Sequence, residues 1–501
     1  MRSPATALRV DLVATVHTIA VLIRWTSVTL VLPLAVALIY GDSIVPFLVP
    51  LAAGFGLGML VEHLTQGCPE IGLREGTAAV AFGWLVAAAL ASLPYIIEGG
   101  DISRPIDAYF EAMSGLTSTG ASVMANVESH SHAILFWRAL TAWMGGMGIV
   151  VLAVAILPRL STGGNLLFES ESSGTNLEKL TPHIRETAKR LWLIYLGFTA
   201  AMISALWIVG ATGRAPEMGL YQAVAHSFAT MATGGFSPRN RSLEPFGAWA
   251  QWIVIVFMVL AAINFGLWYR TLFRNRRALW RDDEVRLFVA ILGIASLIVA
   301  IDLHQHGVFD VAGSIRHAIF QVVTIGSTTG FASTDFATWP ALTWYVLVLL
   351  MLVGGCAGST AGAIKVVRVR LVARLIRREV RQAVHPEIVE PIRLSGTTVS
   401  ESVARSAAIF VLLYLTLFLV ASLLLLIDAD RIGLQVLPID ALAAAATALG
   451  TVGPGLGRLG PMASFAPLSD PSTCLMVVLM WAGRLELIPV LMLASRSFWR
   501  R

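Results

Sequence analysis

Uncharged apolar runs of membrane-spanning length recur along the whole chain. A helix needs about 20 apolar residues to cross a bilayer, and ten runs approach or exceed that length. The run Leu287–Ile301 has only 15 residues, so its flanks are expected to extend it. The predicted spans are Trp25–Gly41, Ser43–Val61, Thr77–Ile97, Ala139–Pro158, Leu191–Gly213, Pro245–Tyr269, Leu287–Ile301, Ala341–Ile364, Ser406–Ile427 and Pro471–Ser495.

Four further segments are too short and too rich in small residues to cross. Each lies between two spans and ends in a turn that contains glycine. They are Ile106–Ala121, Leu220–Phe236, Arg316–Phe331 and Ile439–Gly455. The pattern predicts an all-α polytopic membrane protein, in which an N-terminal two-helix hairpin precedes four repeats of span, half-helix, loop and span. The predicted boundaries are 1–70 for the hairpin and 71–160, 185–275, 283–380 and 400–501 for the repeats.

Composition supports the membrane class. Hydrophobic residues make up 56% of the chain and charged residues 13%, whereas soluble proteins carry about 25% charged residues. These values exclude a disordered chain, a nucleic-acid-binding protein and a secreted disulfide scaffold. Cys68, Cys356 and Cys474 are odd in number and form no CxxC pair, so they indicate neither a disulfide framework nor a structural zinc site.

The basic residues predict the orientation. They concentrate after the sixth and eighth spans and at the end of the chain, all on one side if ten spans alternate. That side is therefore expected to be cytoplasmic, with both termini on it. The mixed-charge segment Arg159–Arg190 is expected to be a solvated connector there. The basic residues are Arg270, Arg274, Arg276, Arg277 and Arg281; Lys365, Arg368, Arg370, Arg374, Arg377, Arg378 and Arg381; and Arg496, Arg500 and Arg501.

The four glycine loops are the candidate binding site. Irregular backbone at membrane depth survives only where it lines a wet cavity or is buried in protein. The end of a half-helix favours a cation, and four loops around one axis form a ring of carbonyl dipoles that can replace its hydration shell. The alternative for any single loop is ordinary small-residue helix packing. The predicted filter segments are Thr117, Ser118, Thr119, Gly120; Met231, Ala232, Thr233, Gly234; Ser327, Thr328, Thr329, Gly330; and Gly450, Thr451, Val452, Gly453.

The eighth span carries a candidate gate. Its glycines weaken a helix, which indicates either a broken helix with a mobile loop or a small-residue packing face. The sequence alone does not separate the two. Lys365 at its end has a simple explanation in snorkelling. The residues concerned are Gly354, Gly355, Gly358, Ser359, Thr360, Gly362 and Lys365.

Arg484 lies near the middle of the last predicted span, where a charge is costly and usually faces a cavity or a partner. It is expected to restrict the closed pore and to hold the gate loop through carbonyl groups. A structural pair with Glu486 or another buried acid is the alternative. The two-residue spacing of Arg484 and Glu486 argues against a direct pair.

Other polar residues in the half-helices have structural explanations. Asp107, Glu111 and Asp440 stand at or near helix starts, where capping or dipole pairing is expected. His226 and His317 are interpreted as hydrogen-bonded residues, because no partner at metal-ligand spacing accompanies them.

Several motifs together resemble the TrkH potassium-uptake family. They are FEAMSGLTSTGA at 110–121, WMGGMGI at 143–149, ATGGFS at 232–237, GGCAGSTAG at 354–362 and GRLE at 483–486. The resemblance covers the chain from the first hairpin to the end, and the hairpin resembles TrkH and TrkG more than the eight-span KtrB branch. One departure is that the family's fourth loop often carries two asparagines where Gly450 and Thr451 stand.

The resemblance implies four pseudo-fourfold helix–pore-helix–helix units around one pore, with a broken second helix in the third. It also implies a homodimer in the bacterial inner membrane, controlled by a cytosolic TrkA-like ring that binds NAD or ATP. The chain itself has no phosphate-binding fingerprint and no expected cofactor; potassium is the transported ligand.

The expected function is therefore gated potassium uptake. A sodium-coupled KtrB-like transporter or a pump-associated potassium subunit stays an alternative. An alternating-access carrier would require inverted repeats, whereas these units share one orientation. An enzyme is not expected, because GxSxG and HExxH motifs are missing.

Overall fold

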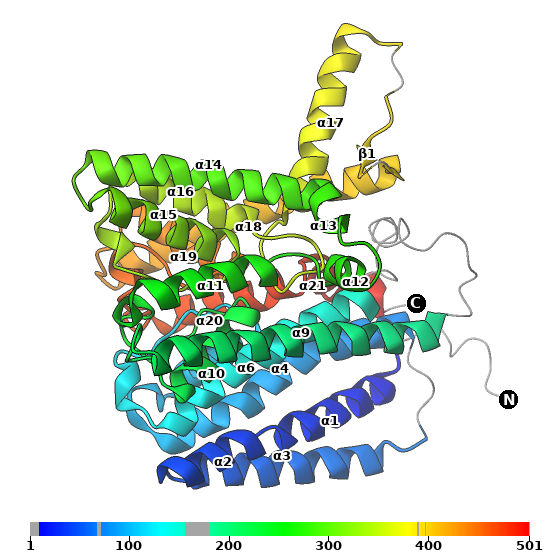
Figure 1. Cartoon of the computed structure of the whole chain (residues 1–501). Coiled ribbons are helices and arrows are strands. Elements are labelled where there is room, and N and C mark those ends of the chain that lie inside the picture. Colours follow the sequence, from blue (N-terminus) through cyan, green and yellow to red (C-terminus); the bar gives the residue numbers. More distant parts are fainter. Residues whose placement is uncertain (1–9, 68–71, 156–179, 388–389, 396, 500–501) are drawn as a thin grey trace, which may run out of the picture.

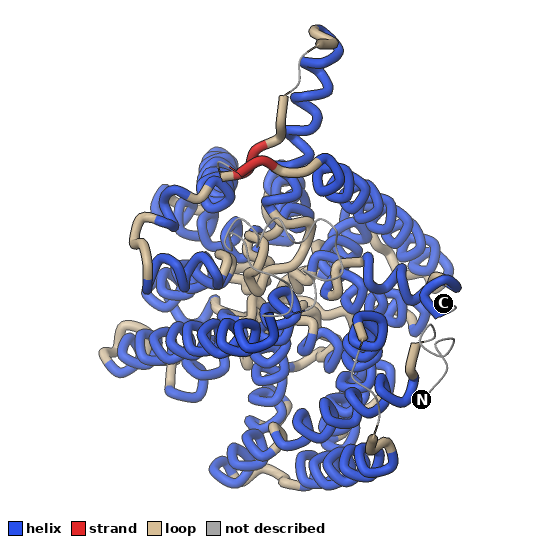
Figure 2. The backbone as a smooth tube through the Cα atoms, turned by 90° about the vertical axis from the view of Figure 1, so that its right-hand side faces the viewer, coloured by secondary structure: helices blue, strands red, loops and turns tan. Residues whose placement is uncertain are grey.

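The computed structural model describes residues 10–67, 72–155, 180–387, 390–395 and 397–499. The helices run roughly side by side and surround a centre filled with irregular backbone (Figures 1 and 2). Most of the predicted connector Arg159–Arg190, and Cys68, lie outside the described residues.

The N-terminal hairpin starts earlier than predicted. Helix α1 (Leu12–Val28) continues after a short turn into α2 (Val31–Tyr40), and α3 (Val45–Leu64) returns along them. The prediction of a start at Trp25 was wrong, because it assumed that the charge of Arg24 ends the span. Arg24 instead lies inside the hairpin, where its Nη1 atom is 2.9 Å from Glu62 Oε2.

Four short helices follow, each between two longer ones. Three of their predicted starts agree within one residue, but α15 begins five residues before Arg316, where the Asp310 carboxylate accepts a hydrogen bond from the Gly313 amide. The short helices are α5 (Pro105–Leu116), α10 (Leu220–Met231), α15 (Val311–Gly326) and α19 (Pro438–Gly450). The helices that precede them are α4 (Leu73–Glu98), α9 (Leu180–Ala211), α14 (Asp283–Gln305) and α18 (Glu401–Arg431).

The second long helix is continuous in the first unit and broken in the other three. In the first unit it is α6 (His132–Ala155). In the second, α11 (Gly247–Ala261) stops before Asn264, whose carboxamide oxygen caps α12 (Phe265–Phe273). In the fourth, α20 (Asp470–Arg484) and α21 (Ile488–Ala494) meet at a bend of 115°. The sequence predicted unbroken spans at both of these places, and that was wrong.

The third unit contains the break that the family resemblance implied. Helix α16 (Ala341–Val353) ends at Gly354, and α17 (Val366–Val384) begins after Lys365. We call the intervening residues Gly354–Lys365 the crossing loop. Helix α17 projects sideways from the bundle (Figure 1), and a small hairpin of β1 (Arg393–Leu394) and β2 (Thr397–Thr398) follows it. This hairpin is the one departure from an all-α fold among the described residues.

Most of the long helices have the length and apolar composition of a membrane span. Among the described residues, seven helices are long and apolar enough to cross a membrane, and eight if the bent pair α20 and α21 counts as one span. The two further predicted spans correspond to the 24-residue α6 and the 13-residue α16.

Both described ends of the chain lie on the same side of the bundle. Val10 and Phe498, which belongs to α22 (Arg496–Trp499), are buried in one small apolar cluster. Helix α13 (Ala278–Arg281) lies on this side of the bundle, at the right in Figure 1. We call this the terminal side. The short helices begin on the opposite side, which we call the loop side.

Candidate ion pathway

The loops that follow the four short helices share one backbone conformation. In each loop, a residue other than glycine has a positive φ angle, which is rare for residues with a Cβ atom. Recurrence at equivalent positions shows that the loops are structural repeats. The residues are Ser118 (53°), Thr233 (52°), Thr328 (56°) and Thr451 (51°).

A glycine with positive φ follows two residues later in every loop. These glycines are Gly120 (81°), Gly235 (60°), Gly330 (85°) and Gly453 (114°). The sequence alignment pairs Gly234 with the others, and the structure shifts this register by one. The segment equivalent to Thr117–Gly120 is therefore Ala232–Gly235, and Met231 is the last residue of α10. Gly234 and Gly235 are adjacent, so only the backbone angle distinguishes them.

The glycines close the loops into a ring. A methyl group on any of them would collide with a carbonyl oxygen of the next loop, in the cyclic order first, second, third, fourth, first. The distances from such a methyl group would be 2.2 Å from Gly120 to Gly234 O, 2.1 Å from Gly235 to Thr329 O, 1.9 Å from Gly330 to Val452 O and 2.8 Å from Gly453 to Thr119 O.

The same four carbonyl oxygens are unpaired within the part of the chain that the structure describes. Among the described residues, none donates a hydrogen bond to the carbonyl oxygen of Thr119, Gly234, Thr329 or Val452. Buried carbonyl groups are normally paired. Four unpaired oxygens around one axis can coordinate a cation that has shed its water.

A buried ion pair ties the first loop to the second. Arg138 Nε lies 2.7 Å from Glu111 Oε1, and both side chains are almost fully buried. The same carboxylate accepts from the Val123 amide at 3.1 Å. Arg138 also donates to the Ser237 carbonyl at 3.3 Å and lies over the Phe236 ring. Glu111 is thus a pairing residue rather than the predicted cap, and the sequence analysis missed Arg138.

Asp440, His226 and His317 make the hydrogen bonds that were predicted for them. Asp440 accepts a hydrogen bond from the Leu437 amide at the start of α19. His226 bonds the Gln222 carbonyl and the Ser237 hydroxyl, and His317 bonds the Ser333 hydroxyl. Among the described residues, no cluster of His, Cys, Asp or Glu could hold a metal ion.

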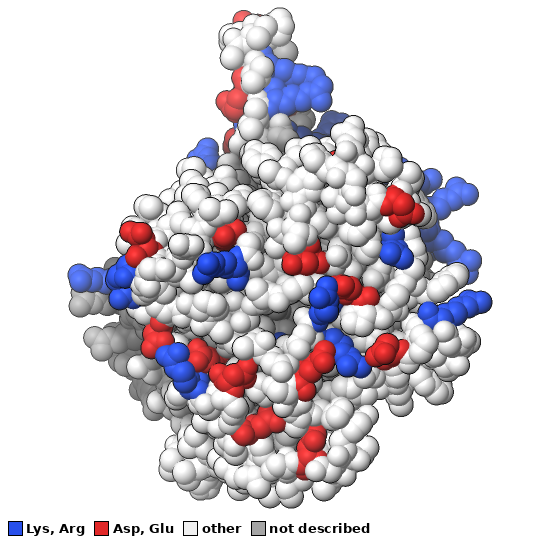
Figure 3. All heavy atoms as spheres, turned by 90° about the vertical axis from the view of Figure 1, so that its left-hand side faces the viewer, with Lys and Arg blue, Asp and Glu red and all other residues white. Residues whose placement is uncertain are grey.

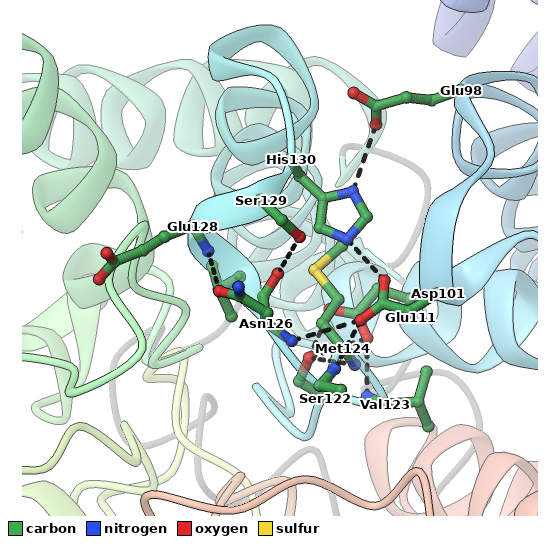
Figure 4. A network of polar contacts seen from close by, with 12 residues as sticks. Glu98, Asp101, Glu111, Ser122, Val123, Met124, Asn126, Glu128, Ser129 and His130 are labelled. Atoms are coloured by element: carbon green, nitrogen blue, oxygen red, sulfur yellow. Dashed lines mark hydrogen bonds and ion pairs between the residues drawn. The ribbon is translucent and has the colours of Figure 1, made fainter.

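A polar network lies on the loop side, outside the spans (Figure 4). The His130 ring stands between two carboxylates, with Nε2 2.7 Å from Asp101 Oδ1 and Nδ1 3.6 Å from Glu98 Oε2. Asp101 Oδ2 accepts from the Ala125 amide at 2.7 Å, five residues beyond Gly120. The His130 clamp, formed by Glu98, Asp101 and His130, therefore holds the chain that leaves the first loop.

The pKa values in the clamp are shifted in opposite directions. Burial opposes protonation of His130, but the nearby Glu98 carboxylate and the hydrogen bond to Asp101 outweigh burial and raise the pKa of His130. Burial opposes ionisation of Asp101, but hydrogen bonds from the Ala125 amide and from His130 outweigh it and lower the pKa. Both shifts favour the ionised pair.

Charges of both signs are interspersed on the loop side (Figure 3). Hydrogen bonds on this side join neighbouring units: the Val127 amide donates to Asn240 Oδ1 at 2.7 Å, and the Asn240 amide donates to Glu128 at 3.1 Å. The polar side chains on this surface thus connect neighbouring units and do not form a patch of uniform charge.

The crossing loop lies against the ends of three short helices. The Gly362 amide donates to Thr328 Oγ1 at 2.9 Å, and Thr360 Oγ1 donates to the Met231 carbonyl at 3.2 Å. A methyl group on Gly362 would lie 2.4 Å from the Gly450 carbonyl oxygen. The loop therefore packs directly against the third and fourth ring segments and against the end of α10, which leads into the second segment.

The break between α11 and α12 forms hydrogen bonds with the crossing loop. The Cys356 amide donates to the Ala262 carbonyl at 2.9 Å, and the Phe265 amide donates to the Gly358 carbonyl at 3.1 Å. The sequence analysis missed this site. An asparagine in the middle of an apolar run, Asn264, was the available signal, because asparagine favours the start of a helix.

Arg484 completes the contacts around the ring. Its Nη1 donates to the Thr360 carbonyl at 2.7 Å, and Nη2 donates to Ser118 Oγ at 3.3 Å and to the Gly145 carbonyl at 3.2 Å. Arg484 is buried at the last residue of α20, directly before the bend. It thus bonds the crossing loop, as its predicted role requires, and also the first ring segment.

Glu486 forms ion pairs with two basic side chains other than Arg484. Its carboxylate lies 3.1 Å from Lys365 Nζ and 2.5 Å from Arg368 Nη2. Among the described residues, no ion pair joins Glu486 to Arg484. Lys365 is only 6% exposed, so the snorkelling explanation for it was wrong: Lys365 turns inward to a buried acid.

The fold and the ring define a class of protein: a multi-span membrane protein whose re-entrant segments meet around one pathway. The family described as "TrkH: Cation transport protein" matches residues 52–501. The chain belongs to the TrkH family, so it is a transport protein and not an enzyme, and the resemblance seen in the sequence is confirmed.

Individual relatives agree over nearly the full length. The chain is 36% identical over 481 residues to the Trk system potassium uptake protein TrkH of Escherichia coli K12, covering 94% of this chain and 96% of the relative. It is 33% identical over 489 residues to TrkG of the same strain, covering 97% and 98%. The crystal structure of the potassium transporter TrkH from Vibrio parahaemolyticus matches with a TM-score of 0.86 and 33% identity, covering 98% of this chain and 100% of that chain. The predicted fold class is confirmed.

Proposed function

We propose that this protein carries potassium into the cell through the ring of four loops. The observation that carries the proposal is the closed ring of unpaired carbonyl oxygens at Thr119, Gly234, Thr329 and Val452. Its relatives are named potassium uptake proteins. Carbonyl dipoles can replace the hydration shell of a monovalent cation, and a membrane potential supplies about 2.3 kcal/mol per charge per 100 mV.

The proposed selectivity filter consists of the four equivalent loop segments, with the register of the second taken from the backbone. The segments are Thr117–Gly120, Ala232–Gly235, Ser327–Gly330 and Gly450–Gly453. The glycines are required because each faces the backbone of the next loop.

The crossing loop and Arg484 form the proposed gate. The loop lies on the terminal side of the ring and bonds three of its segments or their helices, while Arg484 bonds the loop and the remaining segment. A cation leaving the ring meets the loop and a positive charge. Opening requires that both move away together.

The terminal side is the proposed cytoplasmic side. Basic residues gather at the span ends there, as the positive-inside rule requires, and both termini then lie in the cytoplasm of a bacterial cell bounded by its inner membrane. A homodimer and a cytosolic TrkA-like ring that binds NAD or ATP are proposed from family membership.

Growth rescue tests this function in cells. A bacterial strain that lacks its own potassium uptake systems is transformed with the chain and a TrkA-like partner, and growth is measured at low external potassium. We expect growth with the wild-type chain and none with a Gly330→Leu variant inserted in the membrane at equal level. Equal growth of both, or of neither, would contradict the proposal.

A further inference from the structure

We propose that Glu284 is a positioning residue that holds the crossing loop in its pore-closing position. The inference rests on the proposed role of this loop as the gate, but its own evidence is a set of contacts on the terminal side. Neither the sequence analysis nor the family resemblance pointed to Glu284.

One carboxylate oxygen of Glu284 joins the middle of the crossing loop to the helix that follows it. Glu284 Oε1 accepts from the Ala357 amide at 2.8 Å and from the Val367 amide at 3.1 Å. Ala357 lies within the loop and Val367 is the second residue of α17. A single side chain thus fixes two backbone sites on either side of the Gly358–Lys365 stretch that meets the ring.

The bond to Val367 acts as a helix cap supplied from another helix. The first amides of a helix have no partner within it. Lys365, at the N-cap position of α17, does not cap this helix with its side chain. A carboxylate at a helix N-terminus is favoured both as an acceptor and as a negative charge, so Glu284 stabilises the start of α17 exactly where the loop ends.

Three consecutive acids at the start of α14 have three separate partners. Asp282 caps its own helix by accepting from the Glu284 and Val285 amides. Asp283 Oδ2 lies 2.8 Å from Arg370 Nη2 on α17. Glu284 alone faces the crossing loop, so its function is not the ordinary capping that its place in the sequence indicates.

The arrangement couples α17 to the loop. The end of α14 binds α17 through Asp283 and Arg370, and binds the loop through Glu284. Moving the projecting helix α17 away from α14 therefore breaks the hydrogen bond between Glu284 and Val367 and pulls on the loop that Glu284 holds at Ala357. Loss of the Glu284 hydrogen bonds would thus free the crossing loop to move away from the ring.

Cys356 provides a direct test, because it lies beside Ala357 and its side chain is fully buried. In a background with Cys68→Ser and Cys474→Ser, the rate at which a small thiol reagent labels Cys356 measures how often the loop leaves its site. Hydrogen bonds to a charged group contribute enough that Glu284→Ala should speed labelling by about tenfold or more. Glu284→Gln retains an acceptor oxygen and should restore most of the protection.

The matched control is Asp302→Ala, which removes a buried acid near the other end of the same helix. Asp302 accepts a hydrogen bond from Thr343 Oγ1 at 2.8 Å, at the opposite end of α16 from the crossing loop, so labelling of Cys356 should stay at the wild-type rate. If Glu284→Ala does not yield folded protein, Glu284→Asp, whose shorter side chain cannot reach both amides, replaces it with the same expectation.

Unchanged labelling in Glu284→Ala, or equal acceleration in Asp302→Ala, would overturn the inference. Rubidium flux, measured on the same proteins, separates it from the proposed function. Faster labelling with higher partner-independent flux supports both. Faster labelling without any change in flux supports the role of Glu284 in holding the loop but contradicts the proposed role of the loop as the gate.

Discussion

Arg484 Nη1 lies 2.7 Å from the carbonyl oxygen of Thr360, which joins the last residue of α20 to the crossing loop. The other Nη atom reaches Ser118 in the first ring segment. One buried guanidinium therefore bridges the loop and the ring. The fork of donors suits this task, since a lysine ammonium cannot present two separate nitrogen atoms in a fixed plane.

Replacing Arg484 should loosen the closed state. Arg484→Ala removes the bond to Thr360 and the positive charge near the pathway, so cation flux without a partner should rise severalfold. Arg484→Lys keeps the charge and should lie between wild type and Ala. Rubidium uptake by liposomes measures both. Arg458→Ala, a change at a residue outside the spans and exposed, is the control and should have no effect. Wild-type flux in Arg484→Ala would refute this role.

Filter glycines should not tolerate a methyl group. In Gly330→Ala the new group would lie 1.9 Å from the Val452 carbonyl oxygen, so the ring must distort. We expect the preference for potassium over sodium to fall by about tenfold or more, because the spacing and number of coordinating oxygens set selectivity. Competition of sodium with rubidium uptake measures it.

A glycine in open space provides the control for that change. Gly293 lies in α14 with no atom within 4 Å of an added methyl group, so Gly293→Ala should retain the wild-type preference. An unchanged ratio in the Gly330→Ala variant would count against the filter.

The Glu111–Arg138 pair should be important for stability. Removing one partner of a buried ion pair costs about 3–5 kcal/mol, so Arg138→Met should markedly lower the thermal unfolding temperature in detergent. The double variant with Glu111→Gln should recover part of the loss, because it leaves no unpaired buried charge. The exposed pair of Arg241 and Glu244 is the control, with an expected effect below about 1 kcal/mol. Equal effects of the two arginine changes would contradict the assignment.

The His130 clamp should make stability depend on pH. The raised pKa of His130 contributes stability that is complete below its ordinary value of 6.5 and is lost as pH rises through the raised value. The lowered pKa of Asp101 contributes stability that is present above 3.8 and is lost as pH falls through the lowered value. The clamp is therefore strongest in mildly acid solution.

The difference in unfolding temperature between wild type and His130→Gln measures this contribution. From about pH 5 to about pH 9, the difference should shrink as pH rises. His63→Gln, a change at a histidine of the N-terminal hairpin, is the control and should not reproduce this trend. A difference that grows with pH would contradict the sign.

The sequence is informative where a pattern is local. The four short segments are evident because small residues and a glycine recur between apolar runs, and the crossing loop is evident from clustered glycines together with the family resemblance. Arg484 is evident because a charge in an apolar run is rare. These features determine the fold class and most of the candidate site.

What the sequence does not reveal depends on tertiary contacts. Arg138 and Glu111 are 27 positions apart, and neither indicates the other. Asn264 breaks a span, but the residues on either side of it, Ile263 and Phe265, are both apolar and do not indicate a break. Glu284 looks like one of three ordinary acids at a helix start. The register of the second loop depends on which of two adjacent glycines has the positive φ angle, which only the backbone shows.

Rubidium uptake by liposomes that contain the purified chain tests the central claim most directly. An outward proton gradient with a protonophore sets the inside negative, and uptake is compared for the wild-type chain, Arg484→Ala and the wild-type chain with a TrkA-like partner. The account predicts uptake above that of protein-free liposomes, highest in Arg484→Ala or with the partner, and inhibited by potassium far more than by sodium. No uptake above protein-free liposomes in any of the three would contradict it.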